Sequence, residues 1–175
     1  MLTQRHFIRR KGITSVSTQS TLAISVGYQV GDRAPDFTLH NQYDEPVHFY
    51  DLIGTSPIVL YFYPKDNSPT CTAEACAFRD SYEAFSEAGA MIIGISADSV
   101  KSHRRFAETH RLPFQLLSDP NREVHKAYYA LAAFGLLNNR VTFVIDREGI
   151  IRYRFADMLN AKRHVDEALQ IIRAL

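Results

Sequence analysis

The sequence predicts one α/β domain in which a central mixed sheet carries helices on both faces, with a β-hairpin at its N-terminal end. Two observations favour this class. The apolar runs 58–63 and 91–96 are continuous, as in strands covered on both faces, and each is followed by a pattern with helical spacing. In addition, residues 141–155 hold two β-rich runs, after which residues 161–174 return to helical spacing. Such alternation is typical of a sheet that packs between helices.

Composition restricts the classes of function. A chain of 175 residues, 46% of them hydrophobic, can bury one sizeable core. A formal net charge of +1 indicates neither a nucleic-acid-binding surface nor a disordered acidic chain. No apolar run approaches the roughly 18 residues of a membrane span, and two cysteines are too few for a disulfide scaffold. We therefore expect a soluble protein of a reducing compartment, with no nucleic-acid partner and no membrane span.

The first 29 residues differ in composition from the rest. Three arginines and a lysine lie between positions 5 and 11 among several serines and threonines, and no acidic residue precedes Asp32. This is the composition of an organelle transit peptide, although a flexible bacterial extension or an upstream start codon gives the same pattern. We expect residues 1–29 to be a flexible basic extension or leader and residues 30–175 to form the folded domain.

The domain is expected to begin with the hairpin. Phe37 and Leu39 alternate with polar neighbours, residues 41–45 predict a turn, and Val47 and Phe49 alternate again. The buried strand 58–63 comes next.

The first predicted helix begins with a cysteine. The run 58–63 stops at Pro64, a polar loop follows, and helical spacing extends from Cys71 to Ala88. Amide N–H groups in a first helical turn have no helical partner and lie at the positive end of the backbone dipole, so the thiolate of Cys71 is favoured. Cys76, the only other cysteine, is close enough in sequence to trap an oxidised Cys71 as a disulfide.

Further elements continue the alternation. Strand 91–96 leads into a helix that Asp98 or Ser99 can cap and that ends near Pro113. Residues 130–139 are ambiguous. The remaining patterns predict a strand at 114–117, a turn at 118–121, a helix at 122–129, a hairpin of strands 141–145 and 150–155, and a helix at 161–174.

The spacing of the two cysteines has a geometric consequence. Positions i and i+5 of an α-helix are separated by about 7.5 Å along the axis and about 140° around it, which puts their Cα atoms roughly 8 to 9 Å apart. A disulfide needs Cα atoms within about 7 Å. We therefore expect a helix through both Cys71 and Cys76 in the reduced form, and unwinding of that helix whenever the disulfide forms.

Several segments together resemble a known family. Pro64, Ser68 and Cys71 fit the P-x-x-x-[T/S]-x-x-C pattern of the peroxiredoxins, and residues 61–80 look like the bacterioferritin comigratory protein branch, also called the peroxiredoxin Q type. The resemblance covers nearly all of residues 30–175 and continues, in order, through VGDRAPDF, MIIGISADS, LPFQLLSD, RVTFVID and DMLNAKRHVDEAL. The last segment looks most like cyanobacterial and plant members.

The resemblance implies a thioredoxin-like fold and a thiol-dependent peroxidase for hydrogen peroxide and organic (alkyl) hydroperoxides. It implies that Cys71 is the peroxidatic cysteine, that Cys76 is the resolving cysteine, and that thioredoxin or a similar dithiol protein is the reductant. It places the active-site arginine of the family at Arg140, which the sequence alone does not distinguish from other arginines. It implies no cofactor and no metal, and it favours a monomer. A bacterial cytoplasm is the first expected location, and a plastid the second if residues 1–29 are a transit peptide.

Residues near Cys71 have further roles that follow from their chemistry. The Ser68 hydroxyl suits a peroxide oxygen held beside the sulfur, and equally a turn or a cap. Pro64 can shield the thiolate or simply end the strand. Glu74 opposes a nearby thiolate, so we expect it to point away from Cys71 or to pair with a cation. The chain departs from the family at Thr70, where glycine is usual, and at Ser68, where threonine is usual; Thr70 can cap the helix.

Other classes of protein fit the sequence less well. Cys71 and Cys76, with seven scattered histidines, match no familiar zinc pattern, and a copper carrier usually has closer cysteines. A dithiol oxidoreductase more often has a C-x-x-C motif, which is absent. The remaining alternative is a thioredoxin-fold redox or binding module without peroxidase activity, against which the set of Pro64, Ser68, Cys71 and Arg140 argues.

Overall fold

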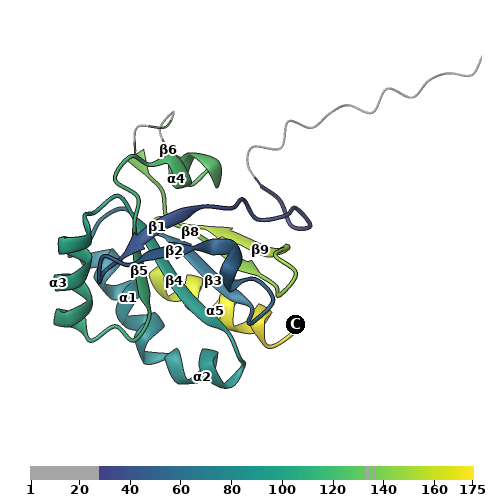
Figure 1. Ribbon diagram of the computed structural model, residues 1–175. Coiled ribbons are helices and arrows are strands. Elements are labelled where there is room, and N and C mark those ends of the chain that lie inside the picture. Colours follow the sequence, from purple (N-terminus) through teal and green to yellow (C-terminus); the bar gives the residue numbers. More distant parts are fainter. Residues whose placement is uncertain (1–27, 133–134, 136) are drawn as a thin grey trace, which may run out of the picture.

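A mixed sheet forms the centre of the structure, a computed structural model that describes residues 28–132, 135 and 137–175 (Figure 1). Within these residues the strands of the sheet are β1 (Thr38–Asn41), β2 (Pro46–His48), β3 (Ile58–Phe62), β4 (Met91–Ser96), β5 (Gln115–Ser118), β8 (Val141–Ile145) and β9 (Ile151–Ala156). Their order is β2-β1-β5-β4-β3-β8-β9. β3, β4 and β5 are parallel, whereas β1, β2, β8 and β9 run antiparallel to their neighbours. The predicted mixed sheet and N-terminal hairpin are confirmed.

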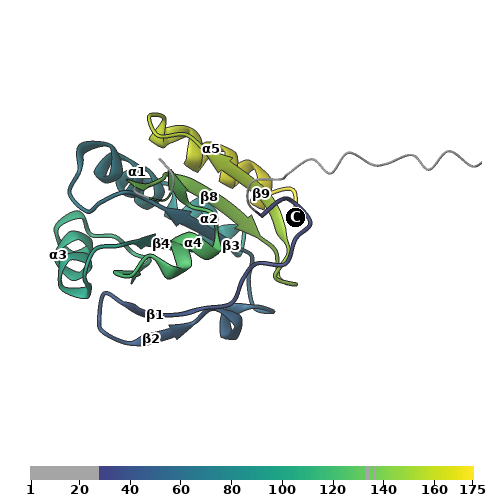
Figure 2. The same cartoon turned by 90° about the horizontal axis from the view of Figure 1, so that it is seen from above.

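Helices cover both faces of the sheet (Figure 2). They are η1 (Phe49–Leu52), a 3₁₀ helix, and α1 (Pro69–Asp80), α2 (Tyr82–Glu87), α3 (Val100–His110), α4 (Glu123–Ala127) and α5 (Ala161–Ile172). α1, α2, α3 and α5 contribute to the core on one face, and η1 and α4 to the core on the other. α5 lies along β8 and β9 (Figure 2).

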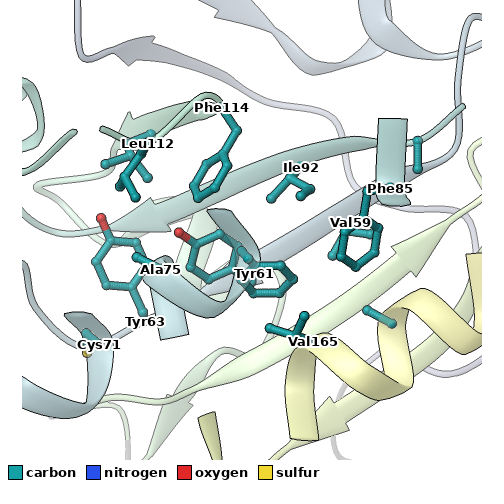
Figure 3. Packing of buried hydrophobic residues seen from close by; sticks show 14 of the residues in the cluster. Val59, Tyr61, Tyr63, Cys71, Ala75, Phe85, Ile92, Leu112, Phe114 and Val165 are labelled. Atoms are coloured by element: carbon teal, nitrogen blue, oxygen red, sulfur yellow. The ribbon is translucent and has the colours of Figure 1, made fainter. Parts of the chain in front are cut away.

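The two cores arise because side chains alternate along each strand. In β3, Val59 and Tyr61 belong to the core under α1 and α5, whereas Leu60 and Phe62 belong to the opposite core. Figure 3 shows Val59 and Tyr61 on the side of the sheet that Val165 of α5 also faces. All five side chains of β3 are buried. The continuous apolar run is thus a strand covered on both faces, as predicted.

Gly94 in β4 makes room for an aromatic ring that supports α1. Tyr61 and Gly94 are register partners in neighbouring strands. A Cβ atom at position 94 would lie 2.7 Å from Cζ of Tyr61 and 2.8 Å from Cδ2 of Leu116, which is closer than side chains pack. The Tyr61 ring stacks in turn on Phe78 of α1, with centroids 4.6 Å apart. The missing side chain in the sheet therefore leaves room for the ring through which β3 contacts α1.

The predicted helix 71–88 differs from the observed one in two respects. The observed helix begins earlier, at Pro69, with Ser68 as the N-cap residue. It is also interrupted at Ser81, between α1 and α2. Proline suits the first helical position because its missing N–H would have no helical partner there. Thr70 lies inside the helix and so is not its cap, contrary to what the sequence suggested.

Smaller differences concern the other elements. Phe49 begins η1 instead of ending a strand, and α4 is shorter than the helix predicted for 122–129. The ambiguous segment contains a separate antiparallel pair, β6 (Leu131–Ala132) and β7 (Leu137–Asn138). The predicted leader lies almost wholly outside the described residues, so the boundary after residue 29 stays a prediction. None of the helices in the described part of the chain has the length and hydrophobicity needed to cross a bilayer.

Candidate active site

The candidate site lies where the end of β3 meets the start of β8. These strands are antiparallel, and Phe62 pairs with Val141. Arg140, which immediately precedes β8, therefore lies beside the point at which the chain leaves β3 and enters the loop to α1. Cys71, the third residue of α1, lies at the same end. Figure 3 shows Cys71 next to Tyr63 at one end of the core under α1.

Strand alternation decides which way Arg140 points. Val144 of β8 belongs to the core under α1 and α5, and Thr142 bonds to His164 of α5, so both face these helices. Arg140 precedes Thr142 by two residues and points to the same face. The guanidinium is 1% exposed. A charged side chain is thus held beneath the first turns of α1.

The Arg140 guanidinium bridges two residues of α1. Nη2 donates to Sγ of Cys71 at 3.3 Å, and Nη1 donates to Oε2 of Glu74. Cys71 and Glu74 are three residues apart and therefore share one face of the helix. Nε donates to the carbonyl oxygen of Met158, in the loop before α5, at 3.3 Å. Three donors in a rigid plane thus fix the position of the charge relative to the sulfur.

Glu74 is paired with a cation, which is one of the two arrangements expected for it. Its side chain is buried, and burial raises the pKa of Glu74 to about 8 against the opposing effect of Arg140. Oε1 of Glu74 has no hydrogen-bond partner in the described part of the chain. Nδ1 of His164 lies 3.8 Å from this oxygen.

His164 closes the site from the side of α5. Nε2 lies 2.9 Å from the carbonyl oxygen of Asp157 and must donate to it, since a carbonyl only accepts. Burial lowers the pKa of His164 to about 4, so the ring is neutral near pH 7 and Nδ1 accepts from the Thr142 hydroxyl at 2.8 Å. The side of Glu74 that faces away from Arg140 therefore meets a neutral imidazole.

Both cysteines are free thiols on one regular helix. This confirms the helix expected through them in the reduced form. Cys71 is 2% exposed, whereas Cys76 is half-buried. Among the described residues, no three or more His, Cys, Asp or Glu side chains come together as a metal-binding group.

Ser68 and Pro64 lie in the loop before α1. The Ser68 hydroxyl donates to the carbonyl oxygen of Lys65 at 3.0 Å and makes no side-chain cap bond to the helix. It therefore has the turn role that the sequence allowed. The carbonyl oxygen of Pro64 accepts from Nδ2 of Asn138 at 3.2 Å, which ties this loop to β7.

Comparisons with known proteins identify the family. Residues 30–154 match the family described as AhpC/TSA. The chain belongs to the AhpC/TSA family. Peroxiredoxin Q, chloroplastic, from Sedum lineare is 43% identical over 146 residues, which is 83% of this chain and 78% of that protein. The protein of the same name from Arabidopsis thaliana is 45% identical over 145 residues, or 82% of this chain and 67% of that protein.

Solved structures agree with this assignment. Peroxidoxin BcpB from Mycobacterium tuberculosis has a TM-score of 0.78 and 36% identity, covering 83% of this chain and 97% of that one. Peroxiredoxin Q from Xanthomonas campestris has a TM-score of 0.73 and 30% identity, covering 79% and 90%. The chain is therefore a peroxiredoxin with a thioredoxin-like fold, and its activity is that of a thiol-dependent peroxidase.

The loop before α1 in this peroxiredoxin is held by a buried aspartate that sequence reasoning missed. Oδ1 of Asp66 accepts from the Tyr63 hydroxyl at 2.7 Å, and Oδ2 accepts from Ser102 at 2.7 Å and from Nδ1 of His103 at 2.9 Å. The Asp66 N–H donates to Asp98 at 2.9 Å. Burial opposes ionisation of Asp66, but the hydrogen bonds and charge of His103 lower its pKa below the usual value.

No local pattern could have revealed this cluster. Ser102 and His103 lie on α3, more than thirty residues from Asp66 in the sequence. His164 was missed for the same reason, since its neighbours Thr142 and Glu74 come from other elements. The available signal was weak: Asp66 is an acidic residue in a short loop next to the cysteine motif.

Proposed function

We propose that Cys71 is the peroxidatic cysteine of this peroxiredoxin and that it reduces hydrogen peroxide and alkyl hydroperoxides. The observation that carries this proposal is the hydrogen bond from Nη2 of Arg140 to Sγ of Cys71 at 3.3 Å. A guanidinium remains charged at neutral pH and stabilises a neighbouring thiolate, which is the nucleophilic form of the sulfur. The position of Cys71 in the first turn of α1 acts in the same direction.

The reaction at Cys71 is a nucleophilic displacement. The thiolate attacks one peroxide oxygen, the O–O bond breaks, and the sulfur becomes a sulfenic acid while water or an alcohol leaves after taking up a proton. Arg140 stabilises the negative charge as it moves from the sulfur to the leaving oxygen. The Ser68 hydroxyl, once turned away from Lys65, holds the peroxide for in-line attack, and Pro64 shields the sulfur from water.

Cys76 acts as the resolving cysteine. Its sulfur attacks the sulfenic sulfur of Cys71, an S–S bond forms, and the S–O bond breaks to release water. Thioredoxin or a similar dithiol protein then reduces the disulfide by thiol exchange. Because both sulfurs of this disulfide belong to one helix, the cycle requires no second subunit, and we propose that the chain works as a monomer.

The test of the proposed roles combines peroxide loss with a thiol count. Reduced wild-type protein should consume about one equivalent of hydrogen peroxide and lose both thiols, which mass spectrometry after alkylation reports. Cys71→Ser should be inert because it lacks the nucleophile, and Cys76→Ser should stop at a sulfenic acid. Rapid peroxide loss in Cys71→Ser, or a Cys71 thiol that survives peroxide unoxidised in Cys76→Ser, would remove the proposal.

We propose that residues 30–175 are the peroxidase domain and that residues 1–29 are a leader or extension, which the family match from residue 30 supports. The relatives from plants are named chloroplastic, which supports a plastid location, whereas the similar structures from Mycobacterium tuberculosis and Xanthomonas campestris leave a bacterial cytoplasm as the alternative. Import of a fluorescent protein carrying residues 1–29 into isolated chloroplasts distinguishes the two. Import with removal of the leader supports the plastid, and absence of import supports the bacterial cytoplasm.

A further inference from the structure

Cys76 has polar neighbours of its own, separate from those of Cys71. Its Sγ lies 3.9 Å from Nδ1 of His110, the last residue of α3. Arg79 follows Cys76 by about one helical turn, and its Nη1 donates to the carbonyl oxygen of His110 at 2.9 Å. Hydrogen bonds to Asp80 raise the pKa of Arg79, and the nearby Cys76 sulfur raises it further. The second thiol thus lies close to both an imidazole and a guanidinium.

The His110 ring is oriented for proton transfer. It packs edge-on against Phe106, one turn earlier in α3, with centroids 4.9 Å apart and an interplanar angle of 68°. This contact and the bond from Arg79 to the His110 carbonyl hold the ring at the end of α3. When the proton of a neutral imidazole is on Nε2, Nδ1 presents a lone pair, and here that nitrogen faces the thiol.

We propose that His110 and Arg79 activate Cys76 for the resolving step, with His110 accepting the thiol proton and Arg79 stabilising the thiolate. The inference rests on the proposed function, because it takes Cys76 to be the resolving cysteine. The Cys76 proton passes to Nδ1 of His110, and the thiolate attacks the sulfur of the Cys71 sulfenic acid. The S–S bond forms as the S–O bond breaks, and the departing hydroxide takes up one proton to become water.

The placement of the two groups on different elements fits the order of events. Only a few per cent of an unassisted thiol is ionised at pH 7, so resolution is slow unless the proton has an acceptor. His110 belongs to α3 and takes the proton while α1 is still helical. Arg79 belongs to α1 and stays near Cys76 in the chain as the helix opens. Arg79, which is paired with Asp80, interacts with Cys76 from α1, and His110 faces Cys76 from α3.

The experiment measures disulfide formation separately from peroxide reduction. Reduced full-length protein is mixed with one equivalent of hydrogen peroxide and quenched at intervals with dimedone and N-ethylmaleimide, so that mass spectrometry resolves thiol, sulfenic acid and disulfide. His110→Gln keeps a polar side chain of similar reach but cannot accept the proton. At pH 7 we expect its sulfenic acid to convert to disulfide about three- to thirtyfold more slowly, with unchanged sulfenic acid formation.

The pH dependence separates activation from a structural effect. Near pH 9 most unassisted thiols ionise, so the deficit of His110→Gln should shrink to less than about twofold. Arg79→Met should slow resolution in the same way, and Arg79→Lys, which keeps the charge, should restore most of the rate. His40→Gln, in the exposed part of the N-terminal hairpin, serves as the matched control and should change neither step.

The results distinguish a failure of this inference from a failure of the proposed function. Equal resolution rates in wild type, His110→Gln and Arg79→Met at pH 7 overturn the inference while leaving the proposed function intact. A deficit that persists at pH 9 also overturns it, because it shows a structural effect. If wild-type protein consumes peroxide and forms no disulfide between Cys71 and Cys76, the assigned role of Cys76 fails, and this inference fails with it.

Discussion

Arg140 carries one positive charge, for which two groups on α1 compete. Nη2 donates to Sγ of Cys71, and Nη1 donates to Glu74. Because burial raises the pKa of Glu74 to about 8, this carboxyl group is mostly neutral at pH 7 and leaves the charge of Arg140 available to the thiolate. Above about pH 8, Glu74 is mostly ionised and competes with Cys71 for the charge of the Arg140 guanidinium.

A pH profile of sulfenic acid formation tests this competition. In wild type the rate should fall about two- to tenfold as the pH rises from 7.5 to 9, because ionised Glu74 withdraws the charge of Arg140. Glu74→Gln should not show this fall. The chain contains no tryptophan, so rapid quench and mass spectrometry are suitable measurements. Glu83→Gln, an exposed change in α2, is the control; a fall of equal size in Glu74→Gln would contradict the competition.

At the scale of residues, local sequence identified the two cysteines but not their partners. Cys71 and Cys76 stand out because they are the only cysteines and share one helical pattern. Arg140 was found only through the family resemblance, because an arginine before a strand is not distinctive. Asp66 and His164 could not be found, since their hydrogen bonds join elements that are distant in the chain.

At the scale of elements, side-chain contacts tie α1 to the start of β8, to β3 and to α3, in addition to its packing against α5. Glu74 is bound to Arg140, Phe78 stacks on Tyr61 of β3, and Arg79 donates to the end of α3. The proposed disulfide between Cys71 and Cys76 requires the first turns to unwind, because i and i+5 positions of a regular helix are too far apart. In the proposed cycle, oxidation therefore releases at least the contact of Glu74 with Arg140, and reduction re-forms it.

Circular dichroism should report this unwinding. Oxidation of wild-type protein with one equivalent of hydrogen peroxide should remove the signal of about two helical turns at 222 nm, and a dithiol should restore it. Cys76→Ser treated in the same way should keep its helical signal because no disulfide forms. Formation of the disulfide without loss of helix would contradict the geometric argument.

The strength of the local pattern decided which elements could be predicted. β3 and β4 were predicted to within one residue because strands buried on both faces are continuous apolar runs. The interruption at Ser81 could not be predicted, since apolar spacing continues from α1 into α2. β6 and β7, of two residues each, are too short to show a period.

At the scale of the whole molecule, His164 couples the last helix to the sheet. Its ring joins α5 to Thr142 of β8 and to the carbonyl oxygen of Asp157. Burial lowers the pKa of His164 from 6.5 to about 4, so the unfolded chain binds more protons than the folded chain between these values. The stability that this group contributes is therefore complete above pH 6.5 and is lost as the pH falls towards 4.

Urea unfolding at two pH values measures this contribution. Between pH 7 and pH 5, the free energy of unfolding of wild type should fall about 2 kcal/mol more than that of His164→Asn. Groups unaffected by the substitution contribute equally to both proteins and cancel in the comparison. The variant should be less stable at pH 7 because Thr142 and Asp157 lose a partner. Equal falls in the two proteins would show that the buried ring does not resist protonation.

The fold class was predictable from the order of elements, whereas the arrangement of the sheet was not. Alternation of strands and helices predicted a mixed sheet with helices on both faces. The pairing of β1 with β5 joins segments about 75 residues apart, and sequence spacing carries no signal for it.

The burial of Cys71 also determines which molecules reach it and when. Cys71 is 2% exposed, so hydrogen peroxide reaches its sulfur far more readily than the thiol of another protein does. In the proposed cycle, a dithiol reductant meets an accessible sulfur only after α1 has opened and the disulfide has formed. The oxidant would thus react with the form in which α1 is helical, and the reductant with the form in which α1 is unwound. The reductant would therefore not react with the enzyme before a peroxide has been reduced.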